Sequence, residues 1–373
     1  MMRRNLIFTT CLACLVSYTG CVDEITLEAR HEPLDEVVIN GRLVYGPVSE
    51  VLVRVETFNP KAFFGASEPI MATGVRLVEA ESGATLEIPV DFTQRGYATK
   101  IPAGDPRFSV EPGKGYLLEV ELPDGRMYQS AIDTLYVGTP MPSVYYEIDQ
   151  KEVLAGDGEI ISEQVLRYSI TAGLKRPDGL GNARFRFTRE SIFKLTESND
   201  NGSFGRMCYL SSEPDRSAML LLDGTQTSNE ELDQVSLEIL EDPLDFRYAE
   251  GYQMTVIQET LSKEAHRYWD QFDRIINRSG TIAEDPVGQL SGNMHSLQDP
   301  EETVFGLFYA THRDTIQQFV TPKEVGMPPM YCPLPENLTP DPDGELVTTL
   351  CDDCAYVWGA DRTSFSKPPH WGG

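Results

Sequence analysis

Short runs of alternating apolar and polar residues, separated by turn sequences, recur from Glu36 to Ile132. In residues 51–57 three valines alternate with Leu, Arg and Glu, and residues 74–80 repeat the period of two. Glu81-Ser-Gly83 and Pro123-Asp-Gly125 are tight-turn sequences of the kind that join two strands into a hairpin. About seven short strands in about a hundred residues are typical of an immunoglobulin-like β-sandwich, which we expect over residues 36–138.

Residues 139–373 are expected to form a second β-rich domain that carries one amphipathic helix. Strand-like segments occupy 164–174 and 183–194, and the helix is expected at about 262–278. Ser262 can cap its start and Gly280 can stop it. A capping box, Ser228-Asn-Glu-Glu231, predicts one or two further helical turns. The apolar face of the main helix consists of Ala265, Tyr268, Trp269, Phe272, Ile275 and Ile276. The fold class is therefore predicted as mainly β, in keeping with 25 prolines and 30 glycines.

The first residues have the layout of an export signal. Arg3 and Arg4 precede an apolar stretch over residues 5–18, which is too short to span a bilayer. The small residue Gly20 before Cys21 indicates a lipoprotein signal peptide over 1–20, with Cys21 lipidated. Residues 21–35 are charged and aperiodic, and are expected to tether the lipid to the folded body.

The formal net charge of −27 limits the partners of the chain. Such a chain repels nucleic acid and anionic head groups, so we expect no nucleic-acid partner and membrane contact through the lipid alone.

Four cysteines remain after the signal and the lipidated residue: Cys208, Cys332, Cys351 and Cys354. In an exported protein an even number favours two disulfides over a zinc or redox site, for which Cys351-Asp-Asp-Cys354 alone is poor support. A bridge within that pair would close almost no chain. We therefore expect Cys208 and Cys332 each to pair with one member of the couple and to clamp the C-terminal tail to the second domain.

Motifs of catalysis are scarce. Ser191–Lys194 and Ser364–Lys367 match a serine–lysine spacing, but lack the companion motifs of penicillin-binding enzymes. The aromatic cluster around Trp269 suits a helix core better than a sugar-stacking platform. Residues 341–345 suit a solvated loop better than a calcium site. No catalytic residue, metal or cofactor is predicted, although paired carboxylates for glycoside cleavage are set by space rather than by sequence.

Several segments taken in order resemble one known family. They are Glu36-Val-Val-Ile-Asn-Gly41, Cys208-Tyr-Leu210, Thr255–Ala265 with Tyr268-Trp269, Gly288–Asn293, Asp299-Pro-Glu-Glu302, Val304–Phe308 and the tail from Cys351 to Trp371. Together they resemble the Bacteroidota family known as domain of unknown function 4249. Gly359-Ala-Asp361 and Pro369-His-Trp371 depart from the usual ending of that family, so the terminal packing is expected to differ.

The resemblance implies an exported lipoprotein, often encoded beside TonB-dependent outer-membrane receptors, with no established activity. It also implies that Asp23 and Glu24 direct the chain to the cell surface, and that Thr134 and Thr315 lie in O-glycosylation sequons. We therefore expect an outer-membrane, surface-exposed lipoprotein that acts as a non-enzymatic accessory or ligand-capture partner of such a receptor, with an unknown ligand. The alternatives are a surface hydrolase acting on a glycan or peptide, and a purely structural envelope protein.

Overall fold

The computed structural model describes most of the chain after Asp35. The described residues are 36–58, 67–90, 96–154, 156, 158–198, 205–212, 219–277, 290, 292–328 and 350–372. The predicted signal peptide (1–20), the tether (21–35) with Cys21, Asp23 and Glu24, and the predicted disulfide partner Cys332 lie outside this part.

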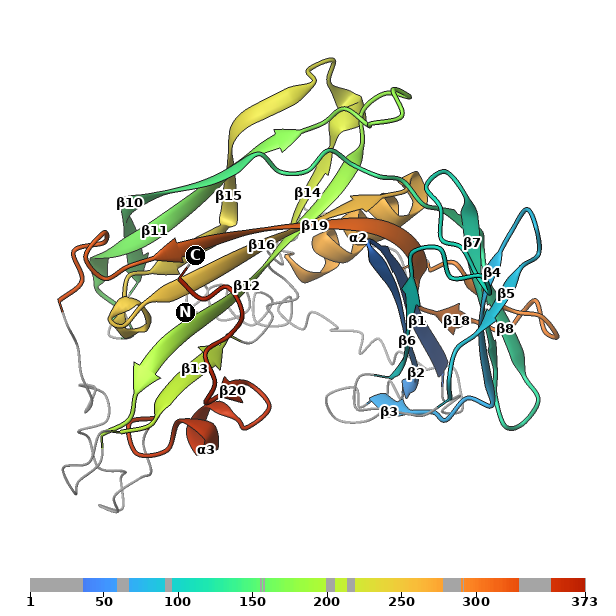
Figure 1. The fold of residues 1–373 in the computed structure, drawn as a ribbon, viewed down its shortest axis with the longest axis horizontal. Helices are drawn as coiled ribbons and strands as arrows, with labels where there is room; N and C mark the ends of the chain where they lie inside the picture. Colours follow the sequence, from blue (N-terminus) through green and yellow to red (C-terminus); the bar gives the residue numbers. More distant parts are fainter. Residues whose placement is uncertain are drawn as a thin grey trace, which may run out of the picture.

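The N-terminal unit is a β-sandwich (Figure 1). One layer contains β1 (Glu36–Tyr45), β2 (Val48–Phe58), β3 (Ser67–Pro69) and β6 (Tyr97–Pro102). The other contains β4 (Gly74–Glu79), β5 (Thr85–Glu87), β7 (Gly115–Glu121), β8 (Met127–Ser130), β9 (Asp133–Thr134) and β17 (Met294–Ser296). The layers meet closely at Gly41, where an added Cβ would lie 2.6 Å from Leu118 Cδ2. The valines of β2 that alternate in the sequence are buried in this core, as their period of two predicts.

An eleven-stranded sheet continues from this sandwich into the rest of the chain. Its main path runs β20-β13-β12-β16-β19-β1-β2-β3, and β14, β18 and β6 pair beside it. The additional strands are β12 (Arg184–Thr196), β13 (Met207–Ser211), β14 (Leu220–Asp223), β16 (Tyr252–Leu261), β18 (Val304–Phe305), β19 (Phe308–Val320) and β20 (Thr363–Ser364). The link is β1, which pairs in parallel with β19 from Gly41↔Phe308 to Tyr45↔His312.

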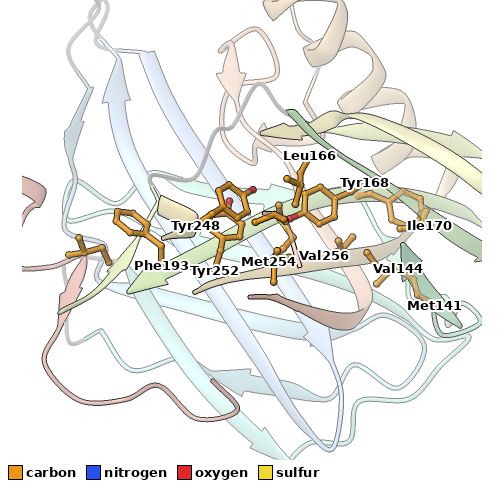
Figure 2. Close-up of a cluster of buried hydrophobic side chains, with 14 of the residues drawn as sticks. Met141, Val144, Leu166, Tyr168, Ile170, Phe193, Tyr248, Tyr252, Met254 and Val256 are labelled. Carbon is orange, nitrogen blue, oxygen red and sulfur yellow. The ribbon is translucent and has the colours of Figure 1, made fainter. Parts of the chain in front are cut away.

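A three-stranded sheet packs against the part of this sheet that contains β12 and β16. It contains β10 (Ser143–Leu154), β11 (Ile160–Gly173) and β15 (Glu231–Pro243). Figure 2 shows Leu166, Tyr168 and Ile170 of β11 beside Met254 and Val256 of β16 in the shared core.

The helix α2 (Lys263–Ile276) agrees with the sequence prediction, and Ser262 Oγ accepts the N–H of Ala265 at its start. The other short elements are η2 (Gly224–Gln226), η3 (Phe246–Tyr248) and α3 (Cys354–Trp358). Within the described ranges, no helix is both long and apolar enough to cross a membrane. The prediction of a mainly β fold with one amphipathic helix is confirmed.

Two local expectations differ from the structure. The helical turns expected after Ser228 do not form, because β15 begins at Glu231 and pairs with β11. The sandwich assigned to residues 36–138 also takes Met294, Phe308 and Ala310 into its core, so strands from the C-terminal half complete it.

Candidate functional site

A pocket of about 420 Å³ lies between α2 and the eleven-stranded sheet. Five elements supply most of its wall: β1, β2, β12, α2 and the start of β19. The lining residues are Asn40, Gly41, Arg42, Leu52, Arg54, Arg186, Thr188, Arg189, Glu190, Met219, Tyr268, Trp269, Phe272, Leu307 and Tyr309.

Strand alternation explains why arginines gather on this face. In β1, Ile39 and Leu43 enter the sandwich core, so Arg42 between them projects from the opposite face. In β12, Phe185 and Phe187 enter the core shared with β11, and Arg186 projects away from it. Both apolar cores thus occupy one face of the long sheet, and α2 covers the polar residues of the other face.

Glu259 is the centre of this polar face. The strand register places Glu259 of β16 between Arg186 of β12 and Arg313 of β19 in one row across the sheet. Its carboxylate pairs with Arg186, lies 3.1 Å from Arg42 Nη1 and 3.0 Å from Arg313 Nη2. The Tyr309 hydroxyl accepts a hydrogen bond from Arg186 Nη2 at 3.0 Å. Three guanidinium groups therefore share one carboxylate.

Electrostatics fix the protonation state of this cluster. Burial alone would raise the pKa of Glu259, but the positive charges of Arg186, Arg42 and Arg313 outweigh it and lower that pKa to about 2. Burial raises the pKa of the Tyr309 hydroxyl. Near neutral pH the carboxylate is thus ionised and the phenol is neutral.

The aromatic side chains of α2 belong to the same site. The Arg186 guanidinium lies 3.7 Å from the ring centroid of Trp269, a cation–π contact. Trp269 also makes edge contacts with Phe272 and Tyr309, with ring centroids 5.4 and 6.1 Å apart. The helical spacing of these aromatic residues predicted that they belong to the core. Tyr268 is indeed buried, whereas Trp269 and Phe272 are half-buried and line the pocket.

Several donors of the cluster have no acceptor. Buried nitrogens without a hydrogen-bond partner, among the described residues, include Arg42 Nε, Arg186 Nε, Arg313 Nε and Trp269 Nε1. Glu259 and Tyr309 offer too few oxygens for three guanidinium groups, each of which has five N–H donors.

The cysteines predicted from the sequence lie elsewhere. Cys208 and Cys354 form a disulfide, and Cys351 is also disulfide-bonded. Leu195, opposite Cys208, lies nine residues along β12 from Arg186, which is roughly 30 Å in an extended strand. Glu197 Oε1 accepts a hydrogen bond from the Cys354 N–H at 3.0 Å. The Glu197 carboxylate and the sulfurs of Cys208 and Cys354 lie within 4.8 Å of one another, close enough to hold a metal ion if the sulfurs were thiolates. The disulfide leaves these two sulfurs no thiolate to offer a metal in this state.

The two threonines of the sequons occupy different settings. Thr315 is exposed on β19, whereas Thr134 is half-buried in β9 and pairs with Gly115. Its neighbour Asp133 is buried and accepts the Ala310 N–H at 2.8 Å. Burial raises the pKa of Asp133 to about 6, although the hydrogen bonds from the Ser262 side chain and the Ala310 backbone act to lower it. Asp133 thus connects the sandwich to the start of α2 and to β19.

The sequence alone did not predict the pocket beneath α2 or its arginine cluster. A signal was present, since Arg186 stands between two phenylalanines in a strand-like segment of an acidic chain. Such a charge must face away from the core or find a partner. What the sequence does not contain is the strand order that brings Arg42, Arg186 and Arg313 to one carboxylate.

Comparison with known protein families identifies a family of unknown function. The family described as "Domain of unknown function (DUF4249)" matches the chain over residues 22–317. That range includes every residue that lines the pocket. No curated protein matches the chain.

Proposed function

The chain belongs to the DUF4249 family, and on that premise we propose that it is an outer-membrane lipoprotein that captures a small ligand for a TonB-dependent receptor. It acts in this proposal without chemical conversion of the ligand. A Bacteroidota source and a cell-surface position are part of the proposal.

The observation that carries the binding role is the pocket beneath α2. Its volume of about 420 Å³ falls within the range of small-molecule sites. Apolar and aromatic walls from Leu52, Trp269 and Phe272 surround a few charged groups, which is the usual composition of such sites.

The same pocket favours binding over catalysis. A general acid or base works best with a pKa near the operating pH. The pKa of Glu259 is held at about 2, and burial raises that of Tyr309, so neither group exchanges protons near neutral pH. This argues against Glu259 or Tyr309 as the general acid or base of a hydrolase.

The proposed placement rests on the N-terminal sequence. Cys21 would carry the lipid, the segment 21–35 would separate it from β1, and Asp23 and Glu24 would direct the chain to the cell surface. Replacing Cys21 by Ser should release the protein from the membrane fraction. Replacing Asp23 and Glu24 by Ala should leave it membrane-bound but inaccessible to protease added to intact cells. Wild-type protein that resists such protease would contradict the surface position.

The partner is tested by affinity purification from native outer membranes in mild detergent. We expect a TonB-dependent receptor to co-purify with the wild-type chain and to be absent when Cys21→Ser protein is isolated from the soluble fraction. If no such receptor co-purifies with the anchored protein, the partner proposal fails.

A further inference from the structure

We propose that the α2 pocket binds an acidic sugar, and that the Arg42 guanidinium receives its carboxylate. The inference rests on the proposed ligand-capture role and names the class of ligand. Three observations carry it: an excess of positive charge, donors without acceptors, and the shape and chemistry of the pocket wall.

The excess of charge is local and opposes the charge of the whole chain. The chain has a formal net charge of −27, yet Arg42, Arg186 and Arg313 converge on the single carboxylate of Glu259. The other arginine on the β12 wall, Arg189, is neutralised by Asp242 at 2.7 Å. The acidic wall residue Glu190 is exposed to solvent. The exposed carboxylate of Glu50 also acts on Arg42, and a bound anion would offset the positive charge that Glu259 and Glu50 leave uncompensated.

Arg42 is the member of the cluster best placed to meet a ligand. It lines the pocket, its side chain is 27% exposed, and its Nε has no acceptor. Arg186 is only 8% exposed and is held between Glu259 and the Trp269 ring, although its Nε also has no acceptor. The Arg42 guanidinium can thus donate hydrogen bonds to a ligand, while buried Arg186 holds Glu259 and Trp269 in place beside it.

The donor geometry favours a carboxylate over a phosphate. A planar guanidinium matches a planar carboxylate through two parallel hydrogen bonds. Phosphate sites commonly add backbone N–H groups from the start of a helix. Here α2 presents Tyr268, Trp269 and Phe272 from its middle, and its first turn is capped by Ser262.

The remaining wall suits a sugar ring. Trp269 and Phe272 offer apolar ring surface, and Asn40 and Thr188 offer polar groups beside it. The volume of about 420 Å³ lies toward the lower end of the range for small-molecule sites, which suits a small sugar.

The test uses the full chain in detergent and isothermal titration with three probes: D-glucuronate, its neutral counterpart D-glucose, and inorganic phosphate. We expect glucuronate to bind and glucose to bind at least tenfold more weakly, because glucose lacks the charged partner of Arg42. Arg42→Gln should weaken glucuronate binding at least tenfold. The matched control is Arg76→Gln, since Arg76 also has a 27% exposed side chain and pairs with one carboxylate, Glu119, but lies outside the pocket wall. It should leave binding unchanged.

A second variant keeps the test independent of any folding defect in Arg42→Gln. Thr188→Glu places a carboxylate on the pocket wall, where it should compete with the ligand for the arginines. It should abolish glucuronate binding without lowering the melting temperature. Equal binding of glucose, preferential binding of phosphate, or glucuronate binding that survives both variants would overturn the proposal.

The outcomes also separate this inference from the proposed function. If a receptor co-purifies but glucuronate does not bind, the ligand class is overturned and the partner stands. If glucuronate binds through Arg42 and no receptor co-purifies, the partner falls and the ligand class stands.

Discussion

At the scale of single residues, Glu259 is the buried charge on which the stability of the fold depends most clearly. Its side chain is 2% exposed, and three arginine side chains lie within ion-pair distance of it. A buried charge of this kind is tolerated only while its partners remain, so each member of the cluster depends on the others.

Replacing Glu259 by Gln should destabilise the protein by about 3 to 5 kcal/mol at pH 7, because it leaves buried arginines without a counter-charge. The matched control is Glu119→Gln: Glu119 pairs with Arg76 but is 22% exposed, so about 1 kcal/mol or less is expected. Urea unfolding measures both. Similar losses for the two variants would contradict the role of Glu259.

The pH dependence of the Glu259 variant follows from the pKa. Because the folded-state pKa of about 2 is below the unfolded value of 4.5, the pairing stabilises the fold above pH 4.5. This contribution is lost as the pH falls from 4.5 toward 2. The free-energy difference between wild type and Glu259→Gln should therefore shrink over that range.

Asp133 should give the opposite trend. Its pKa is raised by burial from 3.8 to about 6, so the folded state holds the proton more tightly than the unfolded state. The wild type should lose about 3 kcal/mol relative to Asp133→Asn as the pH rises from about 4 to about 7. Asn keeps an oxygen that can accept the Ala310 N–H, so the variant should fold. Urea unfolding at several pH values is the measurement, and parallel curves for the two proteins would refute the assignment.

At the scale of elements, the C-terminal tail is held by disulfide bonds at Cys351 and Cys354 and by several weak contacts. Beside the Cys208–Cys354 disulfide, β20 pairs with β13 for two residues, and Trp358 Nε1 donates to the Ser211 carbonyl at 2.6 Å. Trp371 also packs edge-on against Tyr209 and Phe319. Two-residue strands and single contacts fray easily, so the disulfides at Cys351 and Cys354 are the main clamp.

Replacing both Cys208 and Cys354 by Ala should lower the free energy of unfolding by an amount on the order of 3 to 5 kcal/mol, because the bond closes a loop of 146 residues. Hydrogen exchange should rise in α3 and β20 and stay unchanged in α2, which packs elsewhere. Non-reducing peptide mapping of the wild type should recover the Cys208–Cys354 link. Its absence from protein isolated from cells would contradict the clamp.

Elements also differ in how well the sequence predicts them. The helix α2 is predictable because its cap, its charges and its apolar face agree locally. The capping box after Ser228 fails because non-local contacts compete with it. Asn182 Nδ2 donates to the carbonyls of Gly224, Thr227 and Asn229, and β11 then pairs with β15 from Glu231. The α2 pocket could not be predicted for the same reason. Its arginines meet only through the register of four strands, β1, β12, β16 and β19, that are distant in sequence.

At the scale of the whole molecule, the long sheet joins the two halves into one structure. β1 lies between β2, its neighbour in sequence, and β19, which follows it by more than 260 residues (Figure 1). The sandwich core likewise contains Met294, Phe308 and Ala310 from the C-terminal half.

A fragment of residues 36–138 should therefore fail to fold on its own. It would lack the three core side chains from the C-terminal half and would expose the edge of β1 that β19 covers. An uncovered edge of this length is prone to aggregation, and missing core groups cost several kcal/mol in total. Circular dichroism and proton NMR of the fragment should show an unfolded or aggregated chain, while the intact protein should unfold in one cooperative transition. The matched control is the same fragment fused by a flexible linker to residues 292–320, which restores β17, β18 and β19. Recovery of dispersed NMR signals in the fusion would support the shared sheet, and a well-folded 36–138 fragment would contradict it.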